Sequence, residues 1–443
     1  MPARLSPICA CLFAFLVAGC GDSSNLPEHA STGPRPTIPP PNTSFIPTIH
    51  IAPARGWTEG EKPEAAAGLD VNAFAKQLDH PRWLFVLPNG DVLVAESNAP
   101  KRPEDSKGIK GWVYQAVQSW AGAGVPSADR ITMLRDRDGD GVAEMRTVFL
   151  KDLHSPFGMA LIGDELYVAN ADSIVKFKYQ GGATEITSRG EKVADLPGGP
   201  INHHWTKNII PSKDGSRLYA TVGSNSNAAE NGLDAEKMRA AILEINPKNG
   251  EIRTYASGLR NPNGMGWEPH TGQLWTVVNE RDELGRDLVP DYSTSVKEGG
   301  FCGWPFSYWG HHVDDRVQPQ DPERVQNAIV PDYALGNHVA PLGTTFAEGA
   351  KLGNRFVSGV FIGEHGSWNR KPLSGYKVVF VSFAEGKPRG EPIDILTGFV
   401  NSDEKALGRP VGITIARDRS LLVADDVGNT VWRVSKAAQT SNR

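Results

Sequence analysis

The clearest pattern along the chain is a short apolar run that returns six times, flanked by polar residues or turns. A run such as Asp-Val-Leu-Val-Ala-Glu at Asp91–Glu96 is short and rich in β-branched residues, so it predicts a strand. Most of the runs follow a tight turn built from Asn, Asp or Gly, which is typical of hairpins. The six runs are Asp91–Glu96, Glu165–Asn170, Arg217–Val222, Gln273–Val278, Gly359–Gly363 and Ser420–Asp425.

A second kind of run, opened by proline, precedes several of these turns, as at Pro81, Pro156, Pro262 and Pro410. The repeated unit is therefore proline, short strand, tight turn and strand. Six such units with few helix patterns predict an all-β chain folded as a six-bladed β-propeller, which we assign to residues 66–437. The units lie further apart than the roughly 40–50 residues of a plain blade, so insertions are expected. A β-sandwich or two stacked barrels is the alternative.

Two insertions interrupt the repeat. The second runs from about Arg281 to Thr345. The first carries the one amphipathic helical pattern of the body, and we expect this helix to pack on the side of the propeller; a lid or a membrane-facing role is the alternative. Its apolar positions are Ile109, Trp112, Val113, Ala116, Val117 and Trp120.

The N-terminal residues have the pattern of an exported lipoprotein. Residues 1–19 combine a basic residue with an apolar stretch too short to span a bilayer. The stretch ends in Leu-Val-Ala-Gly-Cys20, which resembles a bacterial lipobox and implies cleavage before Cys20 and lipidation of its thiol. An ordinary signal peptide with a chance cysteine is the alternative. We expect a membrane-anchored, periplasm-facing lipoprotein of the bacterial cell envelope, with residues 20–65 as a poorly ordered Pro/Ser/Thr-rich tether and residues 438–443 as a tail.

Composition removes several classes of function. The 443 residues carry a net charge of −5, which argues against nucleic acid as the main partner. Of four cysteines, only Cys302 lies in the body, so neither a disulfide framework nor a cysteine-based metal motif is expected. The chain has no dinucleotide-binding glycine motif, P-loop, nucleophile elbow or haem-attachment motif.

Polar residues are densest in Gly199–Ile209, at the start of a predicted strand. His203 and His204 stand there beside Lys207 and Asn208. Histidine accepts protons readily near neutral pH, so one of the pair is a candidate general base; the alternative is a structural histidine.

Basic residues recur at the corresponding place in other units. Arg260 and Arg409 each precede such a strand, and Arg82 follows Pro81. Because the starts of inner propeller strands line one face around the channel, we expect Lys207 and these arginines to converge. Such a ring of cations predicts a ligand with several carboxylates, since guanidinium groups bind carboxylates in a bidentate manner. Surface arginines paired with local acids are the alternative.

Two acidic stretches are candidate metal sites. Asp136, Asp138 and Asp140 occupy positions 1, 3 and 5 of a calcium-type loop, which lacks the final bidentate glutamate of a complete loop. We expect a structural calcium site there, with an exposed acidic hairpin turn as the alternative. The stretch Glu280–Asp287 offers oxygens for a hard cation or forms a solvated charged loop.

Together these motifs resemble the PQQ-dependent glucose/sorbosone dehydrogenase family of soluble quinoproteins, especially its L-sorbosone dehydrogenase-like members. The resemblance covers about Gly68 to Val434. It implies a six-bladed propeller that binds pyrroloquinoline quinone (PQQ), a tricarboxylate, with a Ca²⁺ ion on the quinone. The motifs that carry it are Gly199–Trp205, Leu259–Gly264, Val278–Leu284, Gly300–Pro305 and Gly363–Arg370.

By position, the resemblance assigns the chemistry to three residues. It makes His204 the base that takes the hydroxyl proton while a hydride leaves the substrate carbon for PQQ. It places Arg260 and Asn261 beside both the cofactor and the substrate.

The resemblance also implies residues that bind the cofactor and the metal. Arg409 matches an arginine on a cofactor carboxylate, and Arg370 or Lys371 matches a lysine on the cofactor. Arg281 and Asp282 match the stretch whose backbone carbonyls hold calcium.

The sequence thus predicts an exported, lipid-anchored dehydrogenase that oxidises a sugar or a sugar-derived, sorbosone-like aldehyde. An aldehyde would react as its hydrate, and electrons would pass to a periplasmic acceptor. One alternative is a calcium-dependent propeller lactonase. The other is a non-catalytic carbohydrate-binding propeller that uses Trp205, Trp304 and Trp368 as stacking platforms.

Overall fold

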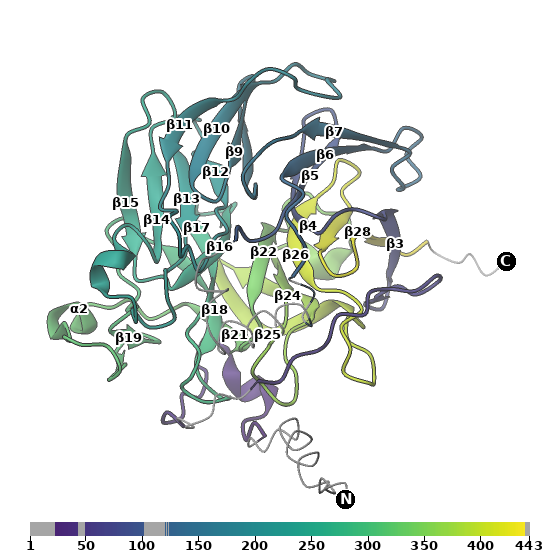
Figure 1. The fold of residues 1–443 in the computed structure, drawn as a ribbon. Coiled ribbons are helices and arrows are strands. Elements are labelled where there is room, and N and C mark those ends of the chain that lie inside the picture. The colour runs from purple at the N-terminus through teal and green to yellow at the C-terminus, as the bar shows by residue number, and fades with distance from the viewer. Residues whose placement is uncertain (1–22, 43–48, 102–119, 121, 123, 439–443) are drawn as a thin grey trace, which may run out of the picture.

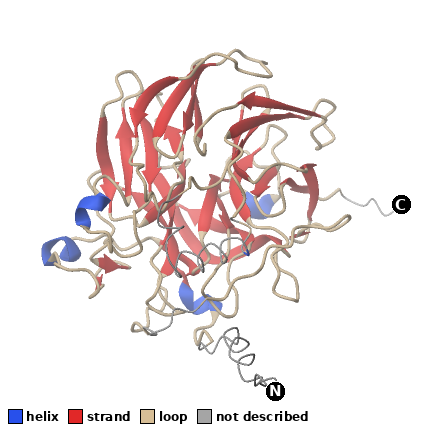
Figure 2. Ribbon diagram, in the orientation of Figure 1, coloured by secondary structure: helices blue, strands red, loops and turns tan. Residues whose placement is uncertain are grey.

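The computed structural model describes residues 23–42, 49–101, 120, 122 and 124–438. Six antiparallel sheets surround a central axis, and helices are few and short (Figures 1 and 2). The predicted all-β, six-bladed propeller is confirmed. Within the described ranges, no helix is long and apolar enough to cross a membrane.

Each blade begins with an inner strand near the axis and steps outward through its neighbours (Figure 1). In blade order, the strands are β4 (Pro81–Val86), β5 (Val92–Glu96), β6 (Arg130–Arg135) and β7 (Met145–Leu150); β8 (Met159–Ile162), β9 (Glu165–Ala169), β10 (Ser173–Lys178) and β11 (Glu191–Asp195); β12 (Ile209–Pro211), β13 (Leu218–Val222), β14 (Ala241–Ile245) and β15 (Ile252–Ser257); β16 (Asn261–Trp267), β17 (Leu274–Asn279), β18 (Pro290–Val296) and β21 (Tyr333–Asn337); β22 (Pro341–Phe346), β23 (Gly359–Glu364), β24 (Lys377–Ala384) and β25 (Lys387–Thr397); and β26 (Pro410–Ile415), β27 (Leu421–Asp425), β28 (Thr430–Lys436) and β3 (Leu69–Ala75).

The two predicted insertions have different outcomes. Between β18 and β21 the chain leaves blade four to form the small hairpin of β19 (Ser307–Tyr308) and β20 (His312–Val313), followed by α2 (Pro322–Gln326). The predicted amphipathic helix lies outside the described residues, except for Trp120, which is exposed. The 3₁₀ segments are η1 (Glu28–Ser31), η3 (Leu233–Glu236) and η4 (Asn354–Phe356).

The N-terminal segment joins the propeller instead of forming a separate tether, which corrects the prediction for the described part of residues 20–65. Strand β1 (Thr32–Gly33) pairs with β21, and β2 (Glu64–Ala65) pairs with β25. The segment is held because it buries apolar surface: Ala52 is fully buried, and the Trp57 ring packs edge-on against Phe399 and Trp432.

Apolar side chains fill the spaces between neighbouring blades. Residues of both adjoining blades meet in these clusters, as where Phe361 and Phe380 of the fifth blade pack in one cluster with Val423 and Trp432 of the sixth. Because each blade is covered on both faces, its strands read as continuous apolar runs instead of strict alternations.

Close packing between neighbouring blades requires the glycine in the runs that begin with proline. A Cβ atom on Gly343 of β22 would lie 2.1 Å from the carbonyl oxygen of Val411 on β26. Inner strands of adjacent blades approach so closely there that only glycine fits. The ladder is bulged at the same place, between Pro341 and Gly343.

Antiparallel pairing gives the propeller two distinct faces. Inner strands start where second strands end, so that Pro410 pairs with Asp425 and Pro81 with Glu96. We call this the front face. The back face carries the turns between inner and second strands, such as residues 87–91.

Candidate functional site

His204 lies on the front face, in the loop between β11 and β12. Its Nδ1 is 2.8 Å from the carbonyl oxygen and 3.0 Å from Oγ of Ser224, and this Oγ donates to the carbonyl of Ser226. A carbonyl oxygen only accepts hydrogen bonds, so Nδ1 carries the proton and the lone pair of the neutral ring is on Nε2. The fold therefore fixes the tautomer suited to accepting a proton at Nε2.

Gly223 brings His204 and Asn261 together. A Cβ atom at Gly223 would lie 2.4 Å from both His204 Cβ and Asn261 Oδ1. These two residues therefore flank the same glycine at the end of β13. The side chain of Asn261 is buried, and its Oδ1 has no hydrogen-bond partner among the described residues. The predicted base and the predicted asparagine are thus neighbours.

Lys207 has a structural role, which corrects its predicted place in the ring of cations. It is fully buried, and its Nζ donates to Asn202 Oδ1 at 3.3 Å and to the carbonyl oxygens of His204 and Trp205 at 3.2 and 3.0 Å. These three acceptors match its three donors. Burial lowers the pKa of Lys207 well below its ordinary value. Lys207 therefore fixes the backbone that carries His204.

Arg260 is held near His204 by contacts that include the carboxylate of Asp282. From the sequence, only the backbone carbonyl of Asp282 was expected to take part in the site, as a calcium ligand. The Arg260 guanidinium donates to the carbonyl of Glu280 and to Asn227 Oδ1, and it lies 3.3 Å from Asp282 Oδ2. Its Nε has no partner in the described chain. The backbone N–H of Ser224 in turn donates to the Arg260 carbonyl, which links this residue to the His204 loop.

Asp282 joins Arg260 to two other blade segments. Its Oδ1 accepts from Asn369 Nδ2 at 2.8 Å and lies 3.4 Å from His338 Nδ1. Burial alone would raise the pKa of Asp282, but the hydrogen bond from His338 and the charge of Arg260 bring that pKa below its usual value. The pKa of His338 is raised: burial alone would lower it, but the contact with Asp282 outweighs that effect.

Arg409 differs from Arg82, Arg260 and Arg281 because none of the described residues gives it a carboxylate partner within ion-pair distance. The residue is 4% exposed. One Nη donates to the carbonyl of Ala52 at 3.3 Å, the guanidinium carbon lies 5.0 Å from the centre of the Tyr376 ring, and Nε has no partner. A buried guanidinium without a counter-ion is costly, so this position is prepared for an anion.

A second buried network, which was not anticipated, lies on the same face. Asp426 accepts from Arg82 and, at 2.9 Å, from His365 Nε2, with His80 Nε2 at 3.6 Å. Burial would raise the pKa of Asp426, but these three neighbours lower it strongly. Burial lowers the pKa of His80 to about 4, which leaves Arg82 as the cation of the group.

The Arg82 guanidinium connects this network to the base loop. Its carbon lies 5.8 Å from the centre of the Trp205 ring, next to His204 in sequence, and 6.0 Å from that of Phe157. Arg82 and Trp205 come from the first and third blades, so this contact spans the start of the channel. Arg82 Nε is without a partner among the described residues.

A signal for these residues was present in the sequence. Asp426 and His365, which were not predicted, each follow one of the six apolar runs at the end of a second strand, as the predicted Asp282 does. Those ends lie on the same face as the starts of inner strands. Asp426 and His365 could have been found by considering, in each unit, both the start of the inner strand and the end of the second strand.

Of the two carbonyls predicted to bind calcium, that of Asp282 is not supported by its contacts, while that of Arg281 stays a prediction. The Arg281 side chain is fully buried and ion-paired with Glu280 and Asp314. The Asp282 carbonyl already accepts from Asn227 Nδ2 at 3.1 Å and from Arg316 at 3.0 Å. Its lone pairs are therefore occupied and do not fit a calcium ion.

Arg370 and Lys371 bind the N-terminal segment. Arg370 donates to the carbonyls of Arg286 and Pro372 and to Ser24 Oγ, and the carbonyl of Lys371 accepts from the Ser24 N–H. Both residues were predicted to contact the cofactor. Arg370 is instead committed to holding the chain near its beginning.

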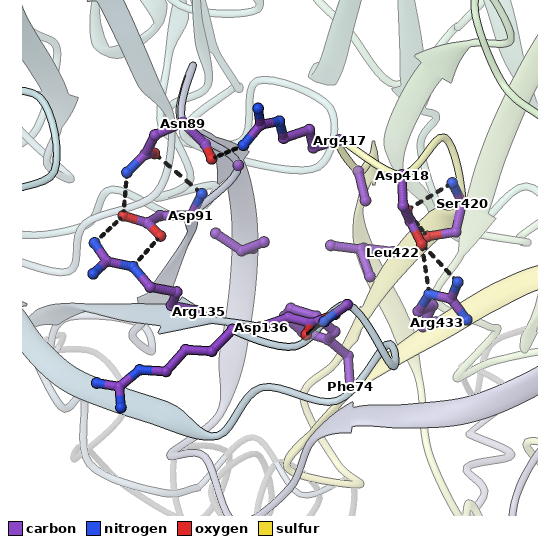
Figure 3. A pocket seen from close by; sticks show the side chains of 15 residues that line it. Phe74, Asn89, Asp91, Arg135, Asp136, Arg417, Asp418, Ser420, Leu422 and Arg433 are labelled. Carbon is purple, nitrogen blue, oxygen red and sulfur yellow. Dashed lines mark hydrogen bonds and ion pairs between the residues drawn. The ribbon is translucent and has the colours of Figure 1, made fainter.

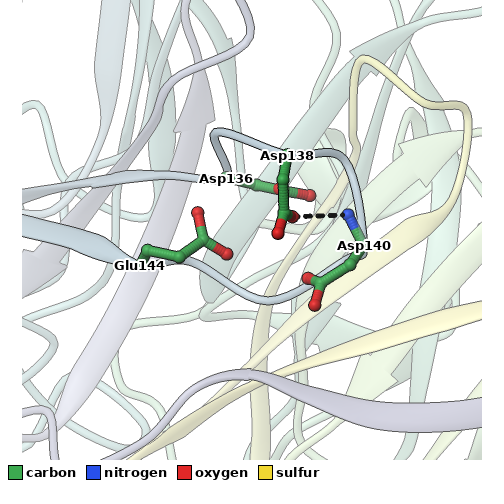
Figure 4. A group of neighbouring side chains, drawn as sticks. All are labelled: Asp136, Asp138, Asp140 and Glu144. Carbon is green, nitrogen blue, oxygen red and sulfur yellow. Dashed lines mark hydrogen bonds between the residues drawn. The ribbon is translucent and has the colours of Figure 1, made fainter.

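The acidic loop of Asp136, Asp138, Asp140 and Glu144 lies on the back face, between β6 and β7 (Figure 4). One oxygen from each of the four carboxylates falls within 4.8 Å of the others, an arrangement that suits a hard cation. The acidic loop lies on the back face, whereas His204 lies on the front face. A cation bound in this loop is therefore separate from the front-face chemistry.

A cavity of about 580 Å³ also opens on the back face, between the first and sixth blades (Figure 3). Two of its four arginines are paired with carboxylates: Arg135 binds Asp91, and Arg433 binds Asp418. Arg417 donates instead to the backbone carbonyl of Asn89.

Two remaining predictions concern tryptophan and lipidation. Trp304 is buried and its Nε1 donates to the carbonyl of Asn227, so it is no stacking platform, whereas Trp368 is 40% exposed. Cys20 lies outside the described residues.

Comparison with known proteins gives a family match over most of the chain. The profile of a family described as TrAA12-like matches residues 126–298 and 310–437. A pyrroloquinoline quinone-dependent pyranose dehydrogenase of Coprinopsis cinerea is 24% identical over 363 residues, which cover 68% of this chain and 48% of that protein. The chain thus spans about half the length of this relative.

Solved structures agree on the fold. A Carbohydrate-Active Enzymes Family AA12 structure from Trichoderma reesei superposes with a TM-score of 0.68 at 18% identity, covering 88% of this chain and 100% of that one. The holo form of the pyranose dehydrogenase PQQ domain from Coprinopsis cinerea gives 0.67 at 20% identity, covering 87% and 100%.

Proposed function

This chain belongs to the TrAA12-like family, and from that premise we propose that it is an exported, lipid-anchored quinoprotein dehydrogenase. Its substrate is a sugar or a sugar-derived aldehyde such as sorbosone, and its cofactor is PQQ. The relatives that support this proposal are themselves PQQ-dependent sugar dehydrogenases by name.

The single observation that carries the proposal is the front-face arginine set. Arg409 is buried without a carboxylate partner among the described residues, and Arg82, Arg260 and Arg409 each keep a buried Nε without an acceptor there. PQQ brings three carboxylates, which are the groups that unsatisfied guanidinium donors bind best. The residues present therefore fit the cofactor, with Arg409 as the principal anion-binding residue.

His204 takes the substrate proton. When bound, PQQ supplies the quinone that accepts a hydride from the substrate carbon. The Nδ1–H of His204 is held by Ser224, so a hydroxyl proton moves to Nε2. Asn261, across Gly223 from His204, offers Oδ1 to orient the same hydroxyl group. A hydrated aldehyde presents the same hydroxyl to this pair.

Calcium belongs to the proposal as an added cation near the cofactor, although the carbonyl of Asp282 is excluded as its ligand by the contacts above. The remaining parts of the proposal are a lipid on Cys20 and a periplasmic acceptor for the electrons, both of which rest on the sequence pattern alone.

Titration of metal-stripped apoprotein with PQQ, with and without calcium, tests the proposal. The quinone absorption reports uptake, and dye reduction with a panel of aldoses and sorbosone reports turnover. Stoichiometric uptake with substrate-dependent bleaching supports the proposal and identifies the substrate class. A folded protein that takes up no PQQ in either condition contradicts it.

A further inference from the structure

The first described residues of the chain are bound to the front face of the propeller. The Ser24 N–H donates to the carbonyl of Lys371 at 2.8 Å, and Arg370 donates to Ser24 Oγ at 2.8 Å. Ser24 Oγ and the Asn25 N–H both bind the carboxylate of Asp287. Four contacts from two blades therefore fix where the N-terminal segment meets the body.

This attachment adjoins the candidate site. Arg370 follows Asn369, which donates to Asp282, the partner of Arg260. The loop that follows β23 thus contacts the N-terminal segment through Arg370 and the candidate site through Asn369. The loop that follows β17 likewise contacts Ser24 through Asp287 and Arg260 through Asp282. Both loops lie at second-strand ends, on the front face.

Large apolar side chains are exposed on the same face. Ile49, Trp120 and Trp368 are 50%, 61% and 40% exposed. They are joined through the N-terminal segment, because the His50 N–H donates to the Trp368 carbonyl and the Ala54 N–H to that of Trp120. Among the described residues Trp120 and Trp368 are the only large exposed aromatic side chains; apart from Ile49, the other large exposed apolar residues are valines and one leucine. Tryptophan and aliphatic side chains held this way are typical of contact with a bilayer interface.

Chain length connects these two observations. Cys20 precedes Ser24 by four residues, which span at most about 14 Å when fully extended. A lipid on Cys20 therefore holds the attachment point, and the site next to it, close to the bilayer. A long flexible tether would leave the propeller free to turn, but the chain is already fixed at Ser24.

We infer that the protein lies with its front face on the membrane, with Ile49, Trp120 and Trp368 at the lipid interface and the exposed Lys371 near the headgroups. The inference rests on the lipid anchor of the proposed function and is independent of the redox chemistry. The back face, with the acidic loop and the cavity of Figure 3, then faces the aqueous phase.

The test uses full-length lipidated protein in vesicles of phosphatidylethanolamine and phosphatidylglycerol. A fluorophore is attached through Lys371→Cys on the front face or Lys248→Cys, an exposed position in the back-face turn between β14 and β15. Labelling is selective because Cys302 is buried and lipidation blocks Cys20. Spin-labelled headgroups should quench the label at position 371 and leave the label at position 248 bright. Equal quenching at both positions, or stronger quenching at 248, overturns the inference.

Two further variants separate the possible causes. Cys20→Ser should move the protein to the aqueous fraction; if the unmodified chain is also found there, the anchor and the orientation fail together. The double variant Trp120→Ser and Trp368→Ser should stay anchored and lose quenching at position 371. Unchanged quenching with weakened sugar binding would assign the tryptophans to carbohydrate and overturn the membrane contact. PQQ uptake by the same preparations shows separately whether the proposed function stands.

Discussion

Arginines on the two faces of the propeller can differ in whether a carboxylate partner is present. On the back face, Arg135 binds Asp91 through two bonds of 2.6 and 2.7 Å, and Arg433 binds Asp418. On the front face, Arg409 is buried without a carboxylate among the described residues, and the Asn261 amide oxygen lacks a donor there. Charge density alone does not distinguish the two faces; unsatisfied buried groups do.

This difference shows how a functional site can be recognised in a fold rich in charged loops. Folding selects against a buried polar group without a partner, because it loses hydration without gaining a protein contact. Several such groups on one face are therefore accepted only if a ligand supplies the missing partners. In the back-face cavity, by contrast, Arg135 and Arg433 are already neutralised by Asp91 and Asp418.

Removing the proposed base should have the largest effect. His204→Ala is expected to lower turnover by about 10²–10⁴-fold, the usual contribution of a general base, while PQQ uptake persists. Single-turnover bleaching of bound PQQ by substrate measures this. His270→Ala, in an exposed back-face turn, is the matched control and should keep normal turnover. Turnover unaffected by His204→Ala would remove this residue from the chemistry.

Neutralising one arginine on each face tests the comparison directly. Arg409→Met should weaken PQQ binding by about 10- to 100-fold, because hydrogen bonds to charged groups contribute about 1.5–3 kcal/mol. The same change should leave the apoprotein as stable as before or more so, since it removes a buried charge without a counter-ion.

The back-face substitution Arg135→Met should show the opposite pattern of effects on stability and on PQQ binding. It leaves the Asp91 carboxylate without its partner and should lower the free energy of unfolding by about 1–2 kcal/mol, with PQQ affinity unchanged. Calorimetry of the apoproteins and PQQ titration give the two quantities. If the two variants behave alike, the contrast between the faces has no energetic basis.

Gly223→Ala should disturb the site through packing. The new Cβ would lie 2.4 Å from His204 Cβ and Asn261 Oδ1, so we expect a loss of about 1–3 kcal/mol in unfolding free energy together with reduced turnover. Gly181→Ala, on a back-face loop with nothing within 4 Å and an ordinary φ, is the control. It should change stability by less than about 0.5 kcal/mol. Urea unfolding and dye reduction measure both effects.

A pH-dependent loss of stability should arise from the front face. Burial raises the pKa of Asp291 to about 7, although it accepts from the N–H groups of Glu280 and Ala340. Its folded pKa exceeds its unfolded value, so this residue costs stability as pH rises from about 4 to 7, by about 4 kcal/mol in total. Asp291→Asn should remove this decline. Parallel pH profiles of unfolding for both proteins would contradict the assignment.

Calcium at the back-face loop should have the smallest effect. If Asp136, Asp138 and Asp140 bind the ion, millimolar calcium should raise the melting temperature of the apoprotein by about 1 °C. Asp138→Asn should abolish the rise, which differential scanning calorimetry measures. A shift that survives this substitution would place the ion elsewhere.

The fold could be predicted from the sequence because its signals are local. Proline, short strand, turn and strand recur with apolar residues on both sides of each strand, which requires sheets covered on both faces. The N-terminal segment was missed because residues such as Ala52 and Trp57 stand alone among prolines and polar residues. Only the assembled propeller offers the surface that buries them.

The site could be predicted only in part, because a sequence does not show where a side chain points. His204, Arg260, Asn261 and Arg409 were identified and all lie at or near strand ends on the front face, where His204 and Asn261 flank Gly223. Lys207 has the same residue type and position as a ligand-binding cation, but it turns inward to its own loop. Partners that are far apart in the sequence, such as Asp426 and Arg82, could not be found by reading single motifs.

The sixth blade has a consequence for the order of folding. Its outer strand β3 lies near the beginning of the chain and pairs with β28 near its end, with Ala75 opposite Val431 and Leu69 opposite Lys436. The ring cannot close until nearly the whole chain has been synthesised. Until then β3 is an unpaired edge strand that can pair with strands of other molecules. Contacts between residues so far apart in the sequence also form slowly. Closure is therefore the step at which this protein most needs protection from aggregation.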